Sequence, residues 1–224
     1  MTTWYTKGKM KKSISILLLL LLLPVSAHAM AAGELAAKLQ ESYDKTADLR
    51  ADFTQDSLVK AMNISRQGSG TLVIKKPGLL RYTYEKPDRQ EIIVKGDELV
   101  MYMPESKQAV KRKLDRAAMD KTPATFLAGL GRITDSFKVN FPKAAQKDKA
   151  GNYILEMTPR GNGMGIKSIT LTVDPATYGI KGFSFVEESG NVNAFALKNI
   201  RINQGVKDSA FDFKIPGGVK IITE

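Results

Sequence analysis

The chain has 224 residues, a formal net charge of +11, one histidine and no cysteine. The absence of cysteine excludes thiol nucleophiles, disulfides and cysteine-based zinc sites. The one histidine, His28, lies in a segment that we predict is removed, so the remaining chain has no imidazole for a Ser-His-Asp triad. The composition therefore favours a binding protein over an enzyme, and we expect neither a metal nor a cofactor.

The first 29 residues have the pattern of an export signal. Four lysines up to Lys12 form a positive region, Ile14 to Leu23 is apolar, and Pro24 precedes the small-residue motif Ala27-His28-Ala29. We predict cleavage after Ala29, which leaves residues 30–224 as a single periplasmic domain; Met10 is an alternative start. The apolar run is too short for the alternative of a membrane anchor. Because no cysteine follows it, the chain is not itself a lipid-modified lipoprotein.

The predicted mature chain is basic. The signal segment holds four lysines and no acid, so residues 30–224 keep a net charge of +7. This charge favours acidic partners such as anionic lipid headgroups or acidic proteins. We expect no nucleic-acid partner, because the chain is exported.

The predicted domain begins with a helix and continues as strands. Leu35, Leu39 and Tyr43 recur every four residues, with Ala36 and Ala47 beside the same stripe, which predicts a helix from Gly33 with one packed face. From Leu49 apolar and polar residues alternate, as in a half-buried strand. Short turns then divide the chain up to Lys113 into an antiparallel meander. The turns are Gly68-Ser69-Gly70, Lys76-Pro77-Gly78 and Lys95-Gly96-Asp97, and the strands run over 71–74, 80–84, 91–94, 99–103 and 109–113.

A helical insertion separates this block from a second one. Thr122 suits the N-cap and Pro123 the first position of a short helix that ends near Gly129, and a second helical piece is predicted over 133–139. Strands follow over 153–159, 166–173, 180–186 and 192–202. The pattern predicts a mainly β fold of the α+β class, with ten or eleven strands that curl into a barrel or partial barrel whose open side the helices cover.

Features that resemble enzyme motifs have simpler explanations. The glycine-rich stretch 161–165 lies between two strands with no helix after it, so we expect a hairpin loop and not a phosphate cradle. The neighbouring carboxylates Glu187-Glu188 and Asp97-Glu98 would point to opposite faces of a strand and could not act as a pair. A periplasmic hydrolase with a Ser-Lys or carboxylate pair is the least favoured alternative.

Large, flexible apolar side chains are common in the predicted strands, and such side chains either fill a core or line an adaptable pocket. The pattern alone favours core filling. The residues are Leu72, Ile74, Leu80, Met101, Met103, Phe183 and Phe185.

An ordered set of short motifs carries a resemblance to a known family. They are Ala51-Asp52-Phe53-Thr54-Gln55, Gly70-Thr71-Leu72, the stretch from Lys75 to Tyr82, Glu85-Lys86-Pro87, the stretch from Gly96 to Leu99, Tyr102-Met103-Pro104, Thr122-Pro123 and Phe211-Asp212-Phe213. In this order and spacing, the chain resembles the periplasmic outer-membrane lipoprotein carrier family, LolA. The resemblance covers nearly all of residues 30–224.

The resemblance implies an incomplete antiparallel β-barrel of about 11 strands, with helices that form a lid over the concave apolar face. It also implies a chaperone without catalytic activity. Such a protein takes triacylated lipoproteins from an ABC-type release complex in the inner membrane and delivers them to a receptor lipoprotein on the outer membrane. We expect a monomer. The alternative is a related periplasmic domain that binds or senses another lipid, such as a glycolipid.

The resemblance also implies site residues. A basic residue before the proline of the turn after the second strand locks the lid by hydrogen bonds to helix backbone; here it is Lys76, where the family usually has arginine, whose planar fork offers more donors. The predicted lid residues are Phe126, Leu127 and Leu130. The predicted acyl-binding residues are Leu72, Ile74, Leu80, Tyr82, Met101 and Met103.

Overall fold

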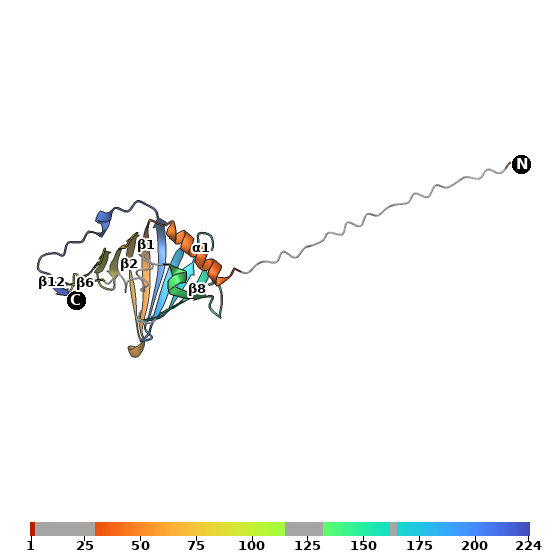
Figure 1. Ribbon diagram of the computed structural model, residues 1–224. Helices are drawn as coiled ribbons and strands as arrows, with labels where there is room; N and C mark the ends of the chain where they lie inside the picture. The colour runs from red at the N-terminus through yellow and green to blue at the C-terminus, as the bar shows by residue number, and fades with distance from the viewer. Residues whose placement is uncertain (3–29, 115–131, 162–164) are drawn as a thin grey trace.

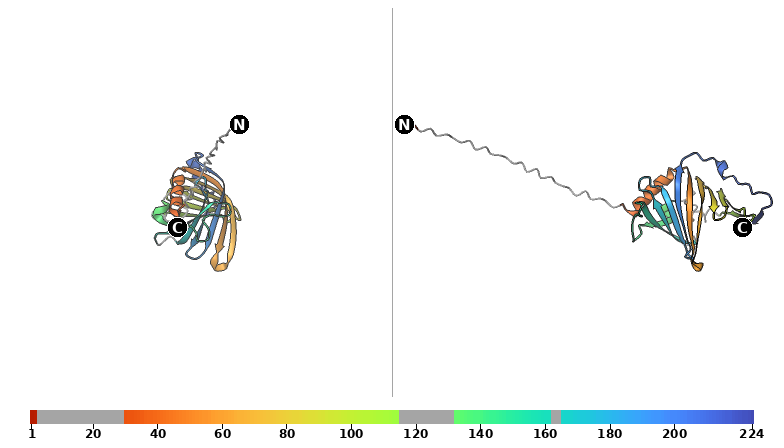
Figure 2. Two further views of the ribbon diagram at one scale, coloured as in Figure 1. Left: turned by 90° about the vertical axis from the view of Figure 1, so that its right-hand side faces the viewer. Right: turned by 180° about the vertical axis from the view of Figure 1, so that it is seen from behind.

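The computed structural model describes residues 1–2, 30–114, 132–161 and 165–224 (Figure 1). The described residues form a single twelve-stranded sheet that curves around helix α1 (Ala32–Asp44), as the end-on view in Figure 2 shows. The strands are β1 (Asp48–Val59), β2 (Ile64–Lys75), β3 (Leu79–Lys86), β4 (Gln90–Lys95), β5 (Glu98–Met103), β6 (Gln108–Lys113), β7 (Phe137–Asn140), β8 (Tyr153–Pro159), β9 (Ile166–Val173), β10 (Ile180–Glu187), β11 (Val192–Ile202) and β12 (Lys220–Thr223).

The sheet is open, which confirms the predicted incomplete barrel. Its order is β12-β6-β5-β4-β3-β2-β1-β11-β10-β9-β8-β7, so β12 and β7 are edges that do not pair with each other. All neighbours are antiparallel except β12, which pairs with β6 in parallel. The sequence predicted about 11 antiparallel strands; the parallel strand at the C-terminal end was missed.

Helix α1 packs its apolar stripe on the concave face of the sheet. Leu35, Ala36 and Leu39 are at most 1% exposed, as the four-residue spacing predicted. The prediction that Ala47 extends the stripe is wrong, because the helix ends at Asp44 and Ala47 is exposed. A second short helix, α4 (Ile133–Ser136), is joined to α1 by the hydrogen bond from the Ile133 N–H to Oε1 of Gln40, 3.0 Å long.

The predicted turn at Gly68-Ser69-Gly70 is wrong, because these residues lie inside β2. The actual β1–β2 turn is the short 3-10 helix η1 (Lys60–Met62), which ends at Asn63 in a left-handed conformation. Gly70 is instead a point of close backbone approach: a Cβ atom there would lie 1.9 Å from the carbonyl oxygen of Thr83 on β3. A glycine within a strand often marks such a contact rather than a turn.

The helical piece predicted over 133–139 is half right. The helix stops at Ser136, and Phe137 begins strand β7, which pairs with β8. Phe137 and Val139 alternate with exposed residues and face the core, so pairing with β8 overrides the local helical pattern. The short helix predicted from Thr122 to Gly129 lies outside the described residues.

The C-terminal segment, residues 203–224, crosses the convex face of β3 and β4 before it adds β12 to the edge (Figure 1). It contains the 3-10 helix η2 (Asp208–Phe211), and Phe211 is only 1% exposed. Arg81 of β3 donates a 3.0 Å hydrogen bond to the carbonyl of Ala210, and the ring of Phe213 lies 5.4 Å from that of Tyr102. The convex side of these strands is therefore covered by the chain's own C-terminal segment.

One buried carboxylate joins the start of β1 to the start of the C-terminal segment. Asp48 is 4% exposed and accepts hydrogen bonds from the backbone N–H groups of Gln204, Gly205 and Val206, between 2.8 and 3.2 Å long. Burial opposes the ionised form, but these donors outweigh it and hold the pKa of Asp48 below its ordinary value.

Candidate binding site

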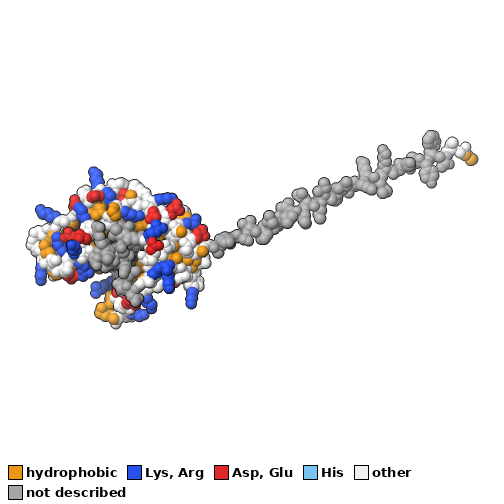
Figure 3. All heavy atoms as spheres, viewed as in Figure 1, with side chains coloured by type: hydrophobic (Ala, Val, Ile, Leu, Met, Phe, Trp, Pro, Cys, Tyr) orange, Lys and Arg blue, Asp and Glu red, His pale blue; other side chains and the backbone are white. Residues whose placement is uncertain are grey.

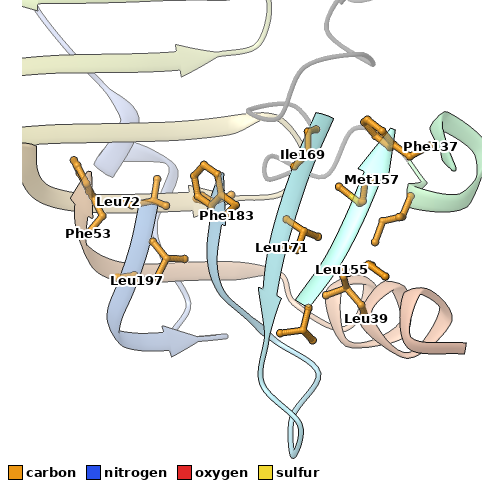
Figure 4. Close-up of a cluster of buried hydrophobic side chains, with 14 of the residues drawn as sticks. Leu39, Phe53, Leu72, Phe137, Leu155, Met157, Ile169, Leu171, Phe183 and Leu197 are labelled. Atoms are coloured by element: carbon orange, nitrogen blue, oxygen red, sulfur yellow. The ribbon is translucent and has the colours of Figure 1, made fainter. Parts of the chain in front are cut away.

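The concave face of the sheet presents apolar side chains from almost every strand. Figure 4 shows part of this cluster: on β8 and β9, Leu155 pairs with Leu171 and Met157 with Ile169, and Leu155 lies beside Leu39 of α1. Strand register places the predicted acyl-binding residues on this same face, because Leu72 pairs with Tyr82, Ile74 pairs with Leu80, and Ile92 pairs with both Tyr82 and Met101.

A cavity of about 310 Å³ lies between α1 and this face. Its walls come from the C-terminal half of α1, the starts of β1 and β10, and the ends of β2 and β11. Leu39, Leu49, Leu72, Ile74, Tyr178, Ile180, Leu197 and Ile200 supply most of the apolar lining. Since the inner surface is apolar and the helix is its roof, the cavity is suited to an apolar ligand.

The six predicted acyl-binding residues occupy different parts of the concave face. Leu72 and Ile74 line the cavity under α1, whereas Met103 lines a second cavity of about 550 Å³ at the rim. Leu80 and Tyr82 are buried in the core at 2% and 9% exposure, and Met101 is half-buried. The predicted lid residues Phe126, Leu127 and Leu130 lie outside the described residues.

Lys76 connects the sheet to the roof of the cavity. Its side chain starts from the β2–β3 turn, and its Nζ donates a hydrogen bond to the backbone carbonyl of Tyr43 in the last turn of α1. The same ammonium lies 3.5 Å from the centre of the Tyr43 ring. Burial lowers the pKa of Lys76, and the negative charge of Asp44 partly opposes this shift. The contact places a cation at the negative end of the helix dipole, where it stabilises the docked helix.

A band of aromatic rings forms the middle of the concave face, and the sequence did not predict it. The Phe53 ring lies 5.5 Å from Tyr82, 4.9 Å from Tyr84 and 5.9 Å from Phe195. Phe183 stacks on Phe195 with ring centres 4.7 Å apart. These residues come from strands far apart in sequence. The only sequence signal for them is period-two alternation, which shows which side chains share one face of a strand but not which strands lie side by side.

The described residues give no support to a metal site or a membrane span. No group of three or more His, Cys, Asp or Glu side chains within them could hold a metal ion. No helix in the described part of the chain is long and apolar enough to cross a bilayer. The surface in Figure 3 carries basic and acidic side chains intermixed.

The fold and the cavity define a half-barrel protein with a helix-roofed apolar hollow. The family model of the outer membrane lipoprotein carrier protein LolA matches residues 44–214, and the chain belongs to this family. The resemblance inferred from the ordered motifs is thereby confirmed.

Individual relatives agree with this assignment. An outer-membrane lipoprotein carrier protein of Actinobacillus succinogenes is 30% identical over 211 residues, covering 94% of this chain and 96% of that protein. One from Pasteurella multocida is 31% identical over 200 residues, covering 89% and 92%. The crystal structure of an uncharacterized conserved protein from Thermus thermophilus has a TM-score of 0.55 at 11% identity and covers 86% of this chain and 99% of that one. It shares the fold.

Proposed function

We propose that this protein is a periplasmic carrier of lipoproteins. It binds the acyl chains of lipoproteins released from the inner membrane by an ABC-type complex and delivers them to a receptor on the outer membrane. The family and the names of its relatives support the cargo class. The observation that carries the proposal is the apolar hollow under α1, closed by the contact between Lys76 and the helix backbone.

The same proposal includes removal of residues 1–29 on export and a carrier role without catalysis. The chain offers no cysteine, and its only histidine is in the predicted signal. In this proposal the site binds and releases its ligand without making or breaking covalent bonds.

The cavity under α1 is too small for the cargo, so it must open to bind it. Each buried methylene contributes about 0.8 kcal/mol, so the roughly 45 methylenes of a triacylated lipoprotein would contribute on the order of 35 kcal/mol if all were buried. Non-covalent affinities reach at most about 20 kcal/mol, and cargo held more tightly would never be released. A cavity of about 310 Å³ is at the small end for a single ligand, so three chains enter only if α1 moves.

Opening offsets part of the energy of acyl burial. Moving α1 exposes Leu35 and Leu39 and breaks the hydrogen bond from Lys76 to Tyr43. A carrier that loses these contacts on loading regains them on unloading, which favours release to a receptor. Lys76 therefore sets the balance between the empty and loaded states in this proposal.

Native mass spectrometry of the protein, purified from the periplasm after co-expression with a triacylated lipoprotein, tests the carrier role. We expect a one-to-one complex that disappears when the acylated cysteine of the lipoprotein is replaced. A protein that is empty, or that holds only a free glycolipid, contradicts the proposal and supports the lipid-sensing alternative.

Lys76→Leu tests the lock. The closed state loses its hydrogen bond to α1, so the variant should retain cargo in a transfer assay with receptor-bearing membranes. Lys75→Leu is the matched control, because the neighbouring Lys75 points to the convex face and pairs with Asp208 at 2.5 Å. Normal release by Lys76→Leu, or equal retention by both variants, removes Lys76 from the mechanism.

A further inference from the structure

A polar belt follows the aromatic band on the concave face. Two residues beyond Phe53 on β1 lies Gln55, and two further lies Ser57; two residues before Phe195 on β11 lies Asn193. The pairing of Gln55 with Phe195 and of Ser57 with Asn193 keeps all of them on one face. The surface therefore changes from aliphatic to aromatic to polar along one direction, away from α1.

The belt is a connected, half-buried hydrogen-bond network. The Nε2 group of Gln55 donates to Oγ of Ser57 at 2.9 Å and to Oδ1 of Asn193 at 3.0 Å. The Ser57 hydroxyl donates to the same Oδ1 at 2.6 Å. Their donors thus converge on a single acceptor and fix the orientation of the Asn193 amide.

Some donors in and beside this network have no hydrogen-bond partner among the described residues. The Nδ2 group of Asn193 makes no hydrogen bond within the described chain, and neither does the guanidinium of Arg66. The phenol of Tyr84 adds a further donor, since burial raises the pKa of Tyr84 to about 12 and keeps it protonated. These groups are accessible to solvent, and as N–H and O–H donors they can bind the acceptor oxygens of a ligand.

The adjoining rim cavity has no excess of charge. Its volume is about 550 Å³, and Gln55, Ser57 and Tyr84 are among its walls. It is also lined by Arg66 and Arg89 and by the acids Asp88 and Glu105, so the two signs balance. Such a site suits neutral carbonyl oxygens better than a phosphate, which needs an excess of positive charge.

We propose that Gln55, Ser57 and Asn193 form a subsite for the ester and amide carbonyl groups at the root of acyl chains. The chains extend past Phe53 and Phe195 into the hollow, and the polar remainder of the ligand leaves through the rim cavity. This assignment rests on the proposed carrier function. It adds a binding site for the polar ester and amide groups of the cargo, which the apolar cavity under α1 does not recognise. The absence of excess charge favours the acylated cysteine of a lipoprotein over an anionic phospholipid.

A pair of synthetic ligands tests the subsite. One is a triacylated cysteinyl peptide, and the other is its diether analogue, in which the two ester carbonyls are replaced by methylenes. The mature protein, residues 30–224, should bind the ester form about tenfold more tightly than the ether form, since two weak hydrogen bonds are lost in the ether. Asn193→Leu removes the donor and should reduce this ratio to near one without weakening binding of the ether.

Further variants separate binding from folding. Asn193→Asp keeps the shape but replaces donors with acceptors, so it should lose the preference for the ester as well. Thr54→Val is the control, because Thr54 lies on the opposite face of β1 and should leave the ratio unchanged. Urea unfolding midpoints show that each variant is folded.

The outcomes are distinct. An unchanged ratio in both Asn193 variants overturns the subsite while leaving the carrier function in place. If the unsubstituted protein binds neither ligand, both proposals fail. An equal ester preference for a diacyl phospholipid and its ether form, lost in the same variants, overturns the assignment to lipoproteins.

Discussion

The two halves of the sheet are covered on opposite faces. Over β7 to β11 the cover is α1 on the concave side, whereas over β3 to β5 it is the C-terminal segment on the convex side (Figures 1 and 2). Strand β9 accordingly buries Ile169, Leu171 and Val173 and leaves the alternate residues less buried. Strand β4 instead is apolar on successive positions, because Ile93 is 3% and Val94 6% exposed on opposite faces.

In the proposed function, this difference separates a cover that must move from one that need not. Helix α1 roofs the cavity and is tied to the sheet by Lys76, so under that proposal cargo enters only when these contacts break. The C-terminal segment covers no described part of the hollow. It stabilises the second half of the sheet from behind and leaves the concave face of β5, with Met101 and Met103, half-buried.

The largest expected effect is loss of the C-terminal cover. Phe211→Ala removes a ring that is 1% exposed and should lower the free energy of unfolding by about 4 kcal/mol. Leu39→Ala is the counterpart on α1 and should cost about 3 kcal/mol. Urea denaturation measures both.

Binding of an apolar fluorescent dye to the folded variants completes the comparison. Only Leu39→Ala should increase it, because α1 roofs the described part of the cavity and the C-terminal segment does not. Equal dye binding by folded Phe211→Ala would show that the two covers do not differ in this way.

The second effect concerns the junction between the halves. Gly70→Ala places a Cβ atom 1.9 Å from the Thr83 carbonyl, so the strands β2 and β3 must separate locally. We expect a loss of about 3 kcal/mol in the free energy of unfolding. Gly33→Ala is the control, since no atom lies within 4 Å of its added Cβ, and in α1 it should stabilise by about 0.5 kcal/mol or more. A neutral Gly70→Ala would contradict the close approach.

The third effect concerns the contact between β1 and the C-terminal segment. The folded-state pKa of Asp48 lies below its ordinary value of 3.8, so its carboxylate stabilises the fold above that pH, and this contribution is lost as the pH falls through the folded-state pKa. Asp48→Asn should cost about 2 kcal/mol at pH 7, because three backbone donors lose their anion. The difference from the unsubstituted protein should shrink below about pH 4, as measured by denaturant unfolding across pH. A difference that stays constant down to pH 2 would exclude the charge as the cause.

The smallest effect sharpens the account of the C-terminal cover. Lys95 pairs with Asp212, but their side chains are 49% and 63% exposed. Lys95→Ala should therefore change the free energy of unfolding by about 0.5 kcal/mol or less. A loss comparable to that of Phe211→Ala would mean that charge, and not apolar burial, holds this segment.

Regular elements followed from the sequence wherever one face of an element was polar. The strands predicted over 153–159, 166–173 and 192–202 match β8, β9 and β11, and Leu35 and Leu39 identified the buried face of α1. Period-two and period-four patterns arise from local geometry, so they survive in the sequence whatever the partner is. The wrong prediction at Gly68–Gly70 shows the limit, because a glycine required by a neighbouring backbone has the same appearance as one in a turn.

The sequence by itself determined the class of the protein: a β-rich chain without cysteine, whose ordered motifs mark the family. Only the tertiary structure decided which face of β4 and β5 is the inner one, since both faces of these strands carry apolar side chains. It also decided that β12 pairs with β6 and that Gln55, Ser57 and Asn193 meet. Residues 55 and 193 come together through strand pairing across more than half the chain, and no local pattern encodes such a contact.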